Sequence, residues 1–194
     1  MSKKNSLKFR ANNSIGKNQN KGWIVKVTIF SLITSAVLYY LSQEILINSG
    51  YFISILVLIT FVLIGIIFDM IGISVTAAEE APFHAMASRK NNAGKKAIRL
   101  IRNANKVSSF CNDVVGDICS VLSGTAVTLI ILNLSKSNSA LNTALAGIIL
   151  SSLVSALTIG GKALGKTSAL RNSNLIVYKV SVILNIFSKR PKKD

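Results

Sequence analysis

The sequence predicts an all-α membrane protein with four transmembrane helices, a cytoplasmic amphipathic interface helix and a C-terminal belt helix. Half of the 194 residues are hydrophobic and only 15% are charged, yet the net charge is +16. The apolar residues form long runs without charge, which a basic soluble domain or a disordered basic tail lacks. One His, two Cys and two Pro leave little material for a His-based active site, a zinc cluster or a disulfide framework. We therefore expect a membrane protein that is not an enzyme.

Four stretches lack charged side chains over about the length that a bilayer requires. They are residues 27–43, 51–68, 118–135 and 137–161. A helix of about 20 apolar residues matches a hydrocarbon core of about 30 Å. The fourth stretch carries small residues that favour close helix packing, and from them we expect a homodimer. These residues are Ala140, Ala144, Ala146, Gly147, Ser151, Ser152 and Ser155.

The basic residues predict the orientation of the chain. Lys and Arg gather in residues 1–22, in the segment 74–117 and after residue 161, whereas the other two connections hold only Lys136. Because Lys and Arg accumulate on the cytoplasmic side, we expect a multi-pass protein of the cell membrane with both termini in the cytoplasm. Residues 1–22 then form a disordered basic arm and residues 189–194 a basic tail, on either side of a helical domain over residues 23–188. Attraction of the arm to anionic lipid requires no nucleic-acid partner.

Two further helices are expected outside the spans. In residues 93–110, basic residues recur every three or four positions (Lys95, Arg99, Arg102 and Lys106). This stripe is typical of an amphipathic helix at a membrane surface, and a solvated helix packed on its own protein is the alternative. Residues 175–187 are apolar but too short to cross a bilayer, which predicts a belt helix beside the bundle.

Polar residues at the predicted cytoplasmic edge of the spans are the candidate functional groups. Placing such groups in lipid costs several kcal/mol unless they face partners, water or an ion. Their oxygen atoms suit Mg²⁺ or Ca²⁺, and helix capping or pairing with nearby Lys and Arg is the alternative. They are Asp69, Ser74, Thr76, Glu79, Asn112, Asp113, Asp117, Gly160 and Gly161.

Residues 160–167 also match the phosphate-loop pattern G-x4-G-K-[ST]. That chemistry requires a loop between a strand and a helix of an α/β domain. Because a long uncharged run precedes the motif and little chain follows it, we expect no nucleotide site here.

The order of several motifs resembles a known family. After the second span stands Thr76-Ala77-Ala78-Glu79-Glu80-Ala81, and Asn112 follows a basic loop near the start of the third span. Gly161-Lys162-Ala163-Leu164-Gly165-Lys166 and Ala169-Leu170-Arg171-Asn172 come last. Over residues 51–188 this order resembles S-x-x-E-x-A, a recurrent Asn, G-E-x-x-P-K and A-x-R-N in the transmembrane domain of CorC/CorB- and CNNM-type magnesium (and cobalt) transporters.

The resemblance implies a dimeric helical domain that binds and moves a divalent cation such as Mg²⁺. It implies a Thr76 hydroxyl, an Asn112 amide and a main-chain oxygen of Gly161 near the ion. We expect Glu79, Glu80 or Asp117 to supply a carboxylate that compensates for the family Glu replaced by Lys162, and we count Glu79 and Asp117 among the candidate ion ligands. The chain departs from the family in three ways. It has Lys162 where the family has Glu and Gly165 where it has Pro, it adds a span at the N-terminus, and no CBS domain is expected after the bundle. The resemblance thus implies ion transport or ion sensing, and the reversed charge at Lys162 leaves a non-transporting scaffold or regulatory subunit as the alternative.

Overall fold

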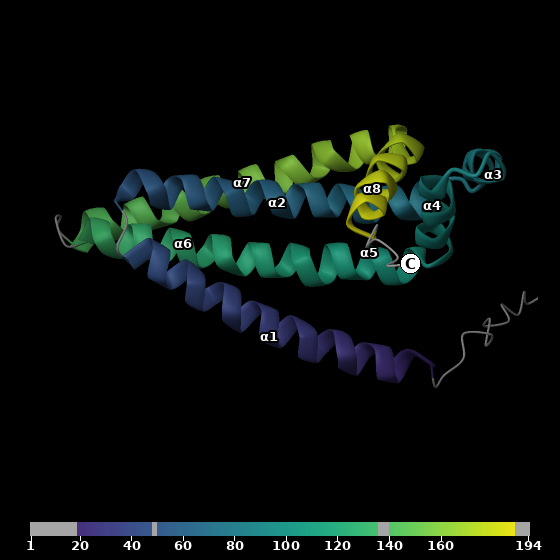
Figure 1. Cartoon of the computed structure of the whole chain (residues 1–194). Helices are drawn as coiled ribbons and strands as arrows, with labels where there is room; N and C mark the ends of the chain where they lie inside the picture. The colour runs from purple at the N-terminus through teal and green to yellow at the C-terminus, as the bar shows by residue number, and fades with distance from the viewer. Residues whose placement is uncertain (1–18, 48–49, 136–139, 189–194) are drawn as a thin grey trace, which may run out of the picture.

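The computed structural model describes residues 19–47, 50–135 and 140–188, and these residues form helices (Figure 1). Four stretches are long and apolar enough to cross a membrane. They are α1 (Gln19–Ile47), α2 (Tyr51–Ala77), the run of α5 (Ala104–Ser109), η1 (Phe110–Gly116) and α6 (Asp117–Ser135), and α7 (Ala140–Arg171). The predicted all-α class with four apolar spans is therefore confirmed. The predicted arm and tail lie almost wholly outside the described residues, although α1 begins at Gln19, before the predicted boundary at residue 22.

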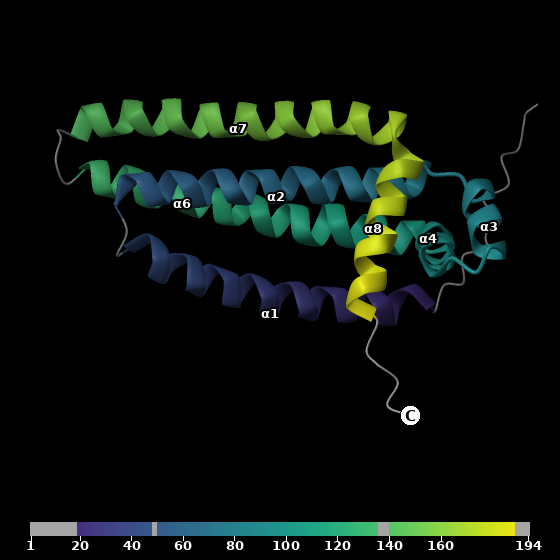
Figure 2. The same ribbon diagram turned by 45° about the horizontal axis from the view of Figure 1, so that its top comes forward.

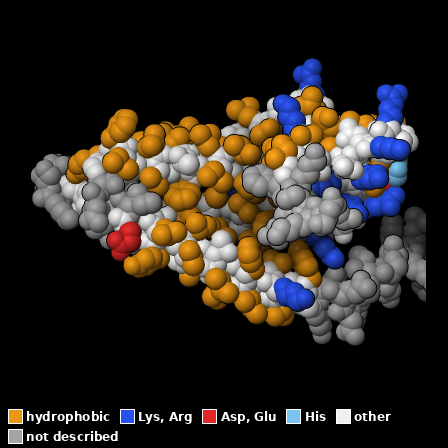
Figure 3. All heavy atoms as spheres, in the orientation of Figure 1, with side chains coloured by type: hydrophobic (Ala, Val, Ile, Leu, Met, Phe, Trp, Pro, Cys, Tyr) orange, Lys and Arg blue, Asp and Glu red, His pale blue; other side chains and the backbone are white. Residues whose placement is uncertain are grey.

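The bundle is built around α2, which packs against α6 and α7, while α1 lies on the outer side of α6 (Figures 1 and 2). Leu58 of α2 is buried with Ala126, Val127 and Ile130 of α6. Many other apolar side chains point outward and cover the sides of the bundle (Figure 3). An apolar outer surface of this extent is typical of a protein whose solvent is lipid.

A cap of short helices closes one end of the bundle. It consists of α3 (Ala81–Ser88), α4 (Asn92–Arg102) and α8 (Ser173–Ser188), and α8 crosses the long helices (Figure 2). Val75 at the end of α2 is buried with Phe83 of α3, Ala97 of α4 and Val177 of α8. The predicted belt segment 175–187 thus lies in α8, where it packs against α4 and α2.

The amphipathic helix predicted over residues 93–110 is divided in two. Asn103 leaves helical geometry, with φ −107° and ψ 25°, and its side chain donates a hydrogen bond to the Arg99 carbonyl oxygen at 2.9 Å. Asn favours such breaks because its amide competes with the backbone for hydrogen bonds. As a result α4 packs into the cap through Ala93, Gly94 and Ala97, whereas α5 enters the third span.

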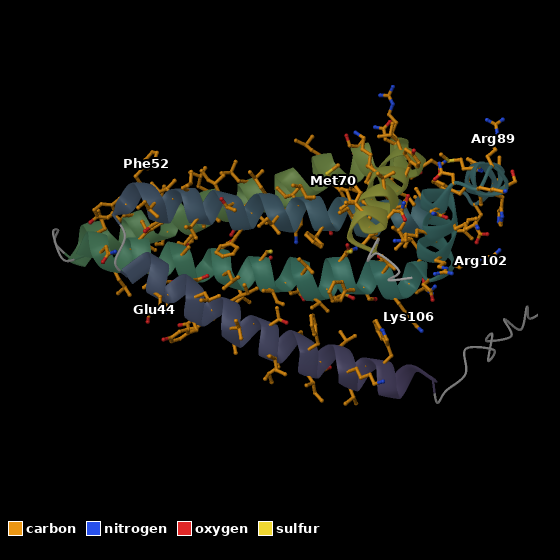
Figure 4. All side chains as sticks on the ribbon, viewed as in Figure 1. Glu44, Phe52, Met70, Arg89, Arg102 and Lys106 are labelled. Atoms are coloured by element: carbon orange, nitrogen blue, oxygen red, sulfur yellow. The ribbon has the colours of Figure 1, made fainter. Side chains whose placement is uncertain are left out.

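The described Lys and Arg residues that flank the spans gather at one end of the bundle (Figure 3). We call this the basic end, and Arg89, Arg102 and Lys106 mark it in Figure 4, opposite Glu44. The alternating directions of the four spans place the start of α1, the loop between α2 and η1, and the end of α7 together there. The pattern of Lys and Arg thus agrees with the fold, and the assignment of this end to the cytoplasm stays a prediction.

The seventh helix runs past the predicted end of its span at Gly161 and ends at Arg171. The phosphate-loop match at residues 160–167 therefore lies inside a continuous helix. The N–H groups of a helix interior point along the helix axis toward preceding carbonyl oxygens, so they are not available to cradle a phosphate.

Candidate functional site

One face of α2 is directed at η1 and α6 and carries a line of small and polar residues. Gly65, Asp69, Gly72 and Thr76 follow each other at steps of four, three and four residues, which places them on the same side of a helix. Gly65 packs on Cys119, since a Cβ built on Gly65 would lie 3.3 Å from the Cβ of that cysteine. Asp69 thus follows Gly65 on the face that α2 turns towards the third span.

Gly72 allows Asn112 to lie directly against α2. A Cβ atom on Gly72 would overlap the Asn112 side chain, whose Oδ1 is the nearest atom and whose Cγ would be 2.9 Å away. Any larger residue at position 72 would therefore push the carboxamide away. We call this contact, with Asp69 and Thr76 on the same face of α2, the α2–η1 site.

Within the described part of the chain, the Asn112 carboxamide forms a hydrogen bond through its NH₂ group but none through its oxygen. Its Nδ2 donates a long hydrogen bond of 3.5 Å to the Ser108 hydroxyl. Its Oδ1 is buried and accepts no hydrogen bond from the described residues. A buried acceptor without a donor costs about 1–3 kcal/mol, so such an atom calls for a specific reason. A cation is one ligand that a carboxamide oxygen, unlike its NH₂ group, can bind.

The backbone around Asn112 is also unusual. Residues Phe110–Gly116 form a π-helix between α5 and α6. Runs of π-helix are rare and occur frequently at functional sites. Here the π-helical turns lie at the point where η1 meets α2, so the irregular backbone and the unpaired oxygen coincide.

Thr76 of this site lies in the last turn of α2, and Glu79 follows three residues later, just past the end of the helix. Thr76 is exposed and its hydroxyl donates to the Ile73 carbonyl oxygen at 2.8 Å, which leaves the oxygen lone pairs for a further partner. Glu79 follows α2, and its backbone N–H donates to the Asn174 Oδ1 of α8 at 3.0 Å, so its exposed carboxylate is held near the start of α8.

Gly161 and Asp117 take no part in the Gly72–Asn112 contact. Gly161 packs α7 against the Ile66 side chain of α2, and as an interior residue of α7 its carbonyl faces along the helix. Asp117 is exposed at the first position of α6. Among the described residues, no hydrogen bond joins any two of Thr76, Glu79, Asn112, Gly161 and Asp117, and no cluster of three or more His, Cys, Asp or Glu side chains is close enough to hold a metal.

Lys162 points into the bundle from α7. A Cβ on Gly116 would lie 3.9 Å from the Lys162 Nζ, and Gly116 stands four residues after Asn112 on η1. Within the described chain, the ammonium forms no ion pair with a carboxylate within 4.0 Å; both pairs found there belong to Glu80. The positive charge is therefore not matched by Glu79 or Asp117.

A groove runs along α6 and α7 on the side of Lys162 away from the basic end, and most of its lining surface is apolar. Its volume is about 280 Å³, and most of its lining side chains carry hydroxyl groups. These are Ser120, Ser123 and Thr128 of α6 and Ser151, Ser155 and Thr158 of α7. Thr158 stands one helical turn before Lys162, so the groove leads towards the ammonium. Four of these hydroxyls, those of Ser120, Ser123, Thr128 and Thr158, donate to a carbonyl oxygen one helical turn earlier in the chain, so they offer oxygen lone pairs to the groove.

Two residues that position the site could not be selected from the sequence. Gly72 is one of several glycines in an apolar run, and only its spacing from Gly65 hints at a contact face. Ser74 was one of many polar residues at the edge, yet it is fully buried and donates to the carbonyl oxygens of Met70 at 2.7 Å and Ala169 at 3.3 Å. The second bond joins α2 to the end of α7, across 95 residues of sequence.

The acidic residue at the cap, Glu80, is held in its charged form. Its Oε2 is bonded to the His84 Nε2 at 3.0 Å and to the Arg102 Nε at 3.3 Å. The hydrogen bond from His84 is the main cause that lowers the pKa of Glu80 below its ordinary value, and Arg102 adds to this effect. Glu80 thus stabilises the link between α3 and α4 and is not a free ligand.

Comparison with known proteins returns no relative. No family model, no curated protein and no solved structure matches the chain.

Proposed function

We propose that this chain binds a divalent cation such as Mg²⁺ at the α2–η1 site, as part of ion transport or ion sensing across the membrane. The observation that carries the proposal is the Asn112 Oδ1, buried and without a donor among the described residues. Asp69 would supply a carboxylate and Thr76 a hydroxyl from the same face of α2. Divalent cations such as Mg²⁺ take carboxylate, carbonyl and hydroxyl oxygens together with water. The order of motifs shared with CorC/CorB- and CNNM-type transporters supports the same ion class.

The hydroxyl-lined groove between α6 and α7 supports a transport role over simple binding. An ion that crosses the membrane needs oxygen atoms along the way, either from the protein or from water that it retains. The groove supplies six Ser and Thr side chains at membrane depth, on the far side of Lys162 from the basic end. Alternating exposure of the α2–η1 site to this groove and to the basic end would move an ion across the bilayer.

The test is calorimetric titration of the purified chain in detergent with Mg²⁺, Mn²⁺ and Co²⁺. We expect wild type to bind at least one of these ions. Asn112→Leu removes the oxygen at nearly constant volume and should weaken binding about 10- to 150-fold, the range for a lost polar contact to a charge. Asn133→Leu, the same change near the far end of α6, is the matched control and should bind as wild type does. Equal affinities for the two variants would refute the site.

A second function is favoured by Lys162. An ammonium inside the bundle repels a divalent cation and occupies the position where the resembling family has Glu. On this interpretation the chain is a membrane scaffold or regulatory subunit that keeps the fold without an ion. Wild type would then bind none of the three ions, whereas Lys162→Glu would bind Mg²⁺. Lys162→Met separates loss of the ammonium from gain of a carboxylate.

The proposed homodimer is a separate matter, because the α2–η1 site lies within one chain. Ala144, Ser151, Ser152 and Ser155 of α7 are exposed, so a second copy could approach α7 closely at these positions. A cysteine added at Ser152 or, as a control, at Leu32 on the exposed side of α1 would test this by cross-linking in membranes, and Cys111 and Cys119 are replaced by serine in both proteins. Only the Ser152→Cys protein should form a covalent dimer.

A further inference from the structure

The first helix separates from the bundle towards the basic end (Figure 1). Further into the membrane it is held by Val27 and Leu38, which pack against the buried cluster of Val114, Ile118 and Leu122. The ring of Phe30 also contacts that of Phe110 in η1, with centroids 5.9 Å apart. Between this contact and the basic end, α1 and the bundle are further apart, and a groove lies between the start of α1 and the corner where α4 meets α5.

This groove has a volume of about 570 Å³, within the range of sites that hold small molecules. One wall is apolar and consists of Trp23 and Ile24 of α1. The opposite wall comes from the corner between α4 and α5 and is mostly polar. Its residues are Ile101, Arg102, Asn103, Ala104, Asn105, Lys106 and Ser109.

The polar wall is positively charged. Arg102 is 61% exposed, and its pairing with Glu80 uses Nε, one of five guanidinium donors. Lys106 is exposed and forms no ion pair within the described chain. Lys26, also exposed, lies one helical turn beyond Trp23 on α1. The groove therefore presents at least two cationic donors to an anion, and a guanidinium beside an ammonium suits a phosphate.

Apolar side chains adjoin the basic residues, and a soluble anion such as free phosphate would gain no binding energy from them. Ile24 in the groove wall is exposed, and so are Phe30 and Phe110, whose rings meet about two helical turns after Trp23 along α1. Trp side chains are favoured at the level of lipid headgroups, where the ring is apolar and its N–H is a donor. This combination of basic and apolar residues is complementary to an amphiphile. Its phosphate would contact Arg102 and Lys106, and its acyl chains would lie against α1.

From this arrangement we propose that the groove between α1 and the α4–α5 corner binds the headgroup of one acidic phospholipid. Basic pockets between membrane helices are known to select acidic headgroups. The bound lipid would fill the opening between α1 and the bundle and so hold α1 in place. The proposal rests on different residues from the α2–η1 site, and either can fail without the other.

Trp23 is the single tryptophan of the chain and lies in the groove wall, so it reports on the bound lipid directly. The full-length protein is placed in phosphatidylcholine nanodiscs that contain a small, equal fraction of either brominated phosphatidylglycerol or brominated phosphatidylcholine. Bromine quenches tryptophan fluorescence on contact. We expect phosphatidylglycerol to quench Trp23 more strongly at equal fraction. Inorganic phosphate in the buffer should not reverse the effect, since a free anion gains nothing from the apolar wall.

Two variants of equal charge decide whether the groove is the site. Arg102→Gln with Lys106→Gln removes the bases of the groove, whereas Lys95→Gln with Arg99→Gln removes two exposed bases of α4 outside it. Each base near a lipid surface contributes about fivefold in affinity. The Arg102→Gln, Lys106→Gln protein should therefore lose most of its preference for phosphatidylglycerol, whereas the Lys95→Gln, Arg99→Gln protein should keep nearly all of it. Lys106→Gln alone leaves the Glu80 pairing intact and should reduce the preference about fivefold. Equal quenching by the two lipids, or equal losses in the two pairs, would overturn the proposal.

Discussion

The contact between Gly72 and Asn112 leads to the sharpest test of the packing at the α2–η1 site. In Gly72→Ala the new methyl group would overlap the Asn112 Oδ1 and lie 2.9 Å from its Cγ and 3.2 Å from its Nδ2. Excess volume in a packed interior costs about 1–3 kcal/mol. Alanine in a helix interior returns about 1 kcal/mol relative to glycine. The free energy of unfolding should therefore fall by about 0–2 kcal/mol.

Gly160→Ala is the matched control for this change. Gly160 also lies inside a long helix, but a Cβ at this position would meet no atom within 4 Å. Only the gain in helix propensity applies, so this variant should be about 1 kcal/mol more stable than wild type. The two variants should differ by about 1–3 kcal/mol. For a chain of this size that difference corresponds to roughly 2–12 °C in Tm, measured as thermal unfolding in one detergent.

A double variant shows whether the carboxamide itself is the cause. Asn112→Ala removes the atoms that the Gly72→Ala methyl group would meet. Added to Asn112→Ala, the glycine change should then be harmless, with a coupling free energy of about 1–3 kcal/mol between the two sites. The reasoning is refuted if Gly72→Ala is as stable as Gly160→Ala, or if its penalty persists after Asn112 has been truncated.

Three further predictions concern the cap, and thermal unfolding in detergent measures each. Gly94→Ala should lower the free energy of unfolding by up to about 2 kcal/mol. Its Cβ would lie 3.0 Å and 3.1 Å from backbone atoms of α3, so the cost of overpacking exceeds the gain in helix propensity. An increase in Tm would contradict this close packing. Phe83→Ala, at a side chain only 1% exposed, should cost about 3–5 kcal/mol and Phe83→Leu less than about 1.5 kcal/mol; similar losses would mean that the ring fills no packed space. The depressed pKa of Glu80 implies stability that is present above its ordinary value of 4.5 and lost as the pH falls through the lower pKa of the folded state. Between about pH 5 and pH 3 the Tm of wild type should therefore fall more than that of Glu80→Gln, in which His84 and Arg102 have no carboxylate to pair with. Parallel curves of Tm against pH for the two proteins would refute this role of Glu80.

The sequence by itself determined where the long apolar helices lie and which of their ends come together. Both properties follow from the local composition of the chain. A sufficiently long uncharged apolar run is stable in lipid, whereas Lys and Arg accumulate in the connections on one side of the membrane. The same local information identified Asn112 and Thr76 as polar groups in an apolar setting. It also predicted that residues 160–167 are not a phosphate loop, and these residues lie within α7, which continues to Arg171.

Only the tertiary structure decided which of these groups meet. Asn112 lies against Gly72, 40 positions earlier in the chain, and Ser74 bonds to Ala169. The π-helix at Phe110–Gly116 lies where the third span packs against α2, whereas the break at Asn103 has a local cause in the hydrogen bond of its own amide. A helical period specifies which residues share a face, but the depth and rotation at which two faces meet depend on all the side chains between them. For that reason the sequence marks the polar residues, while the packing of α2 against η1 decides which of them has a buried oxygen with no donor among the described residues.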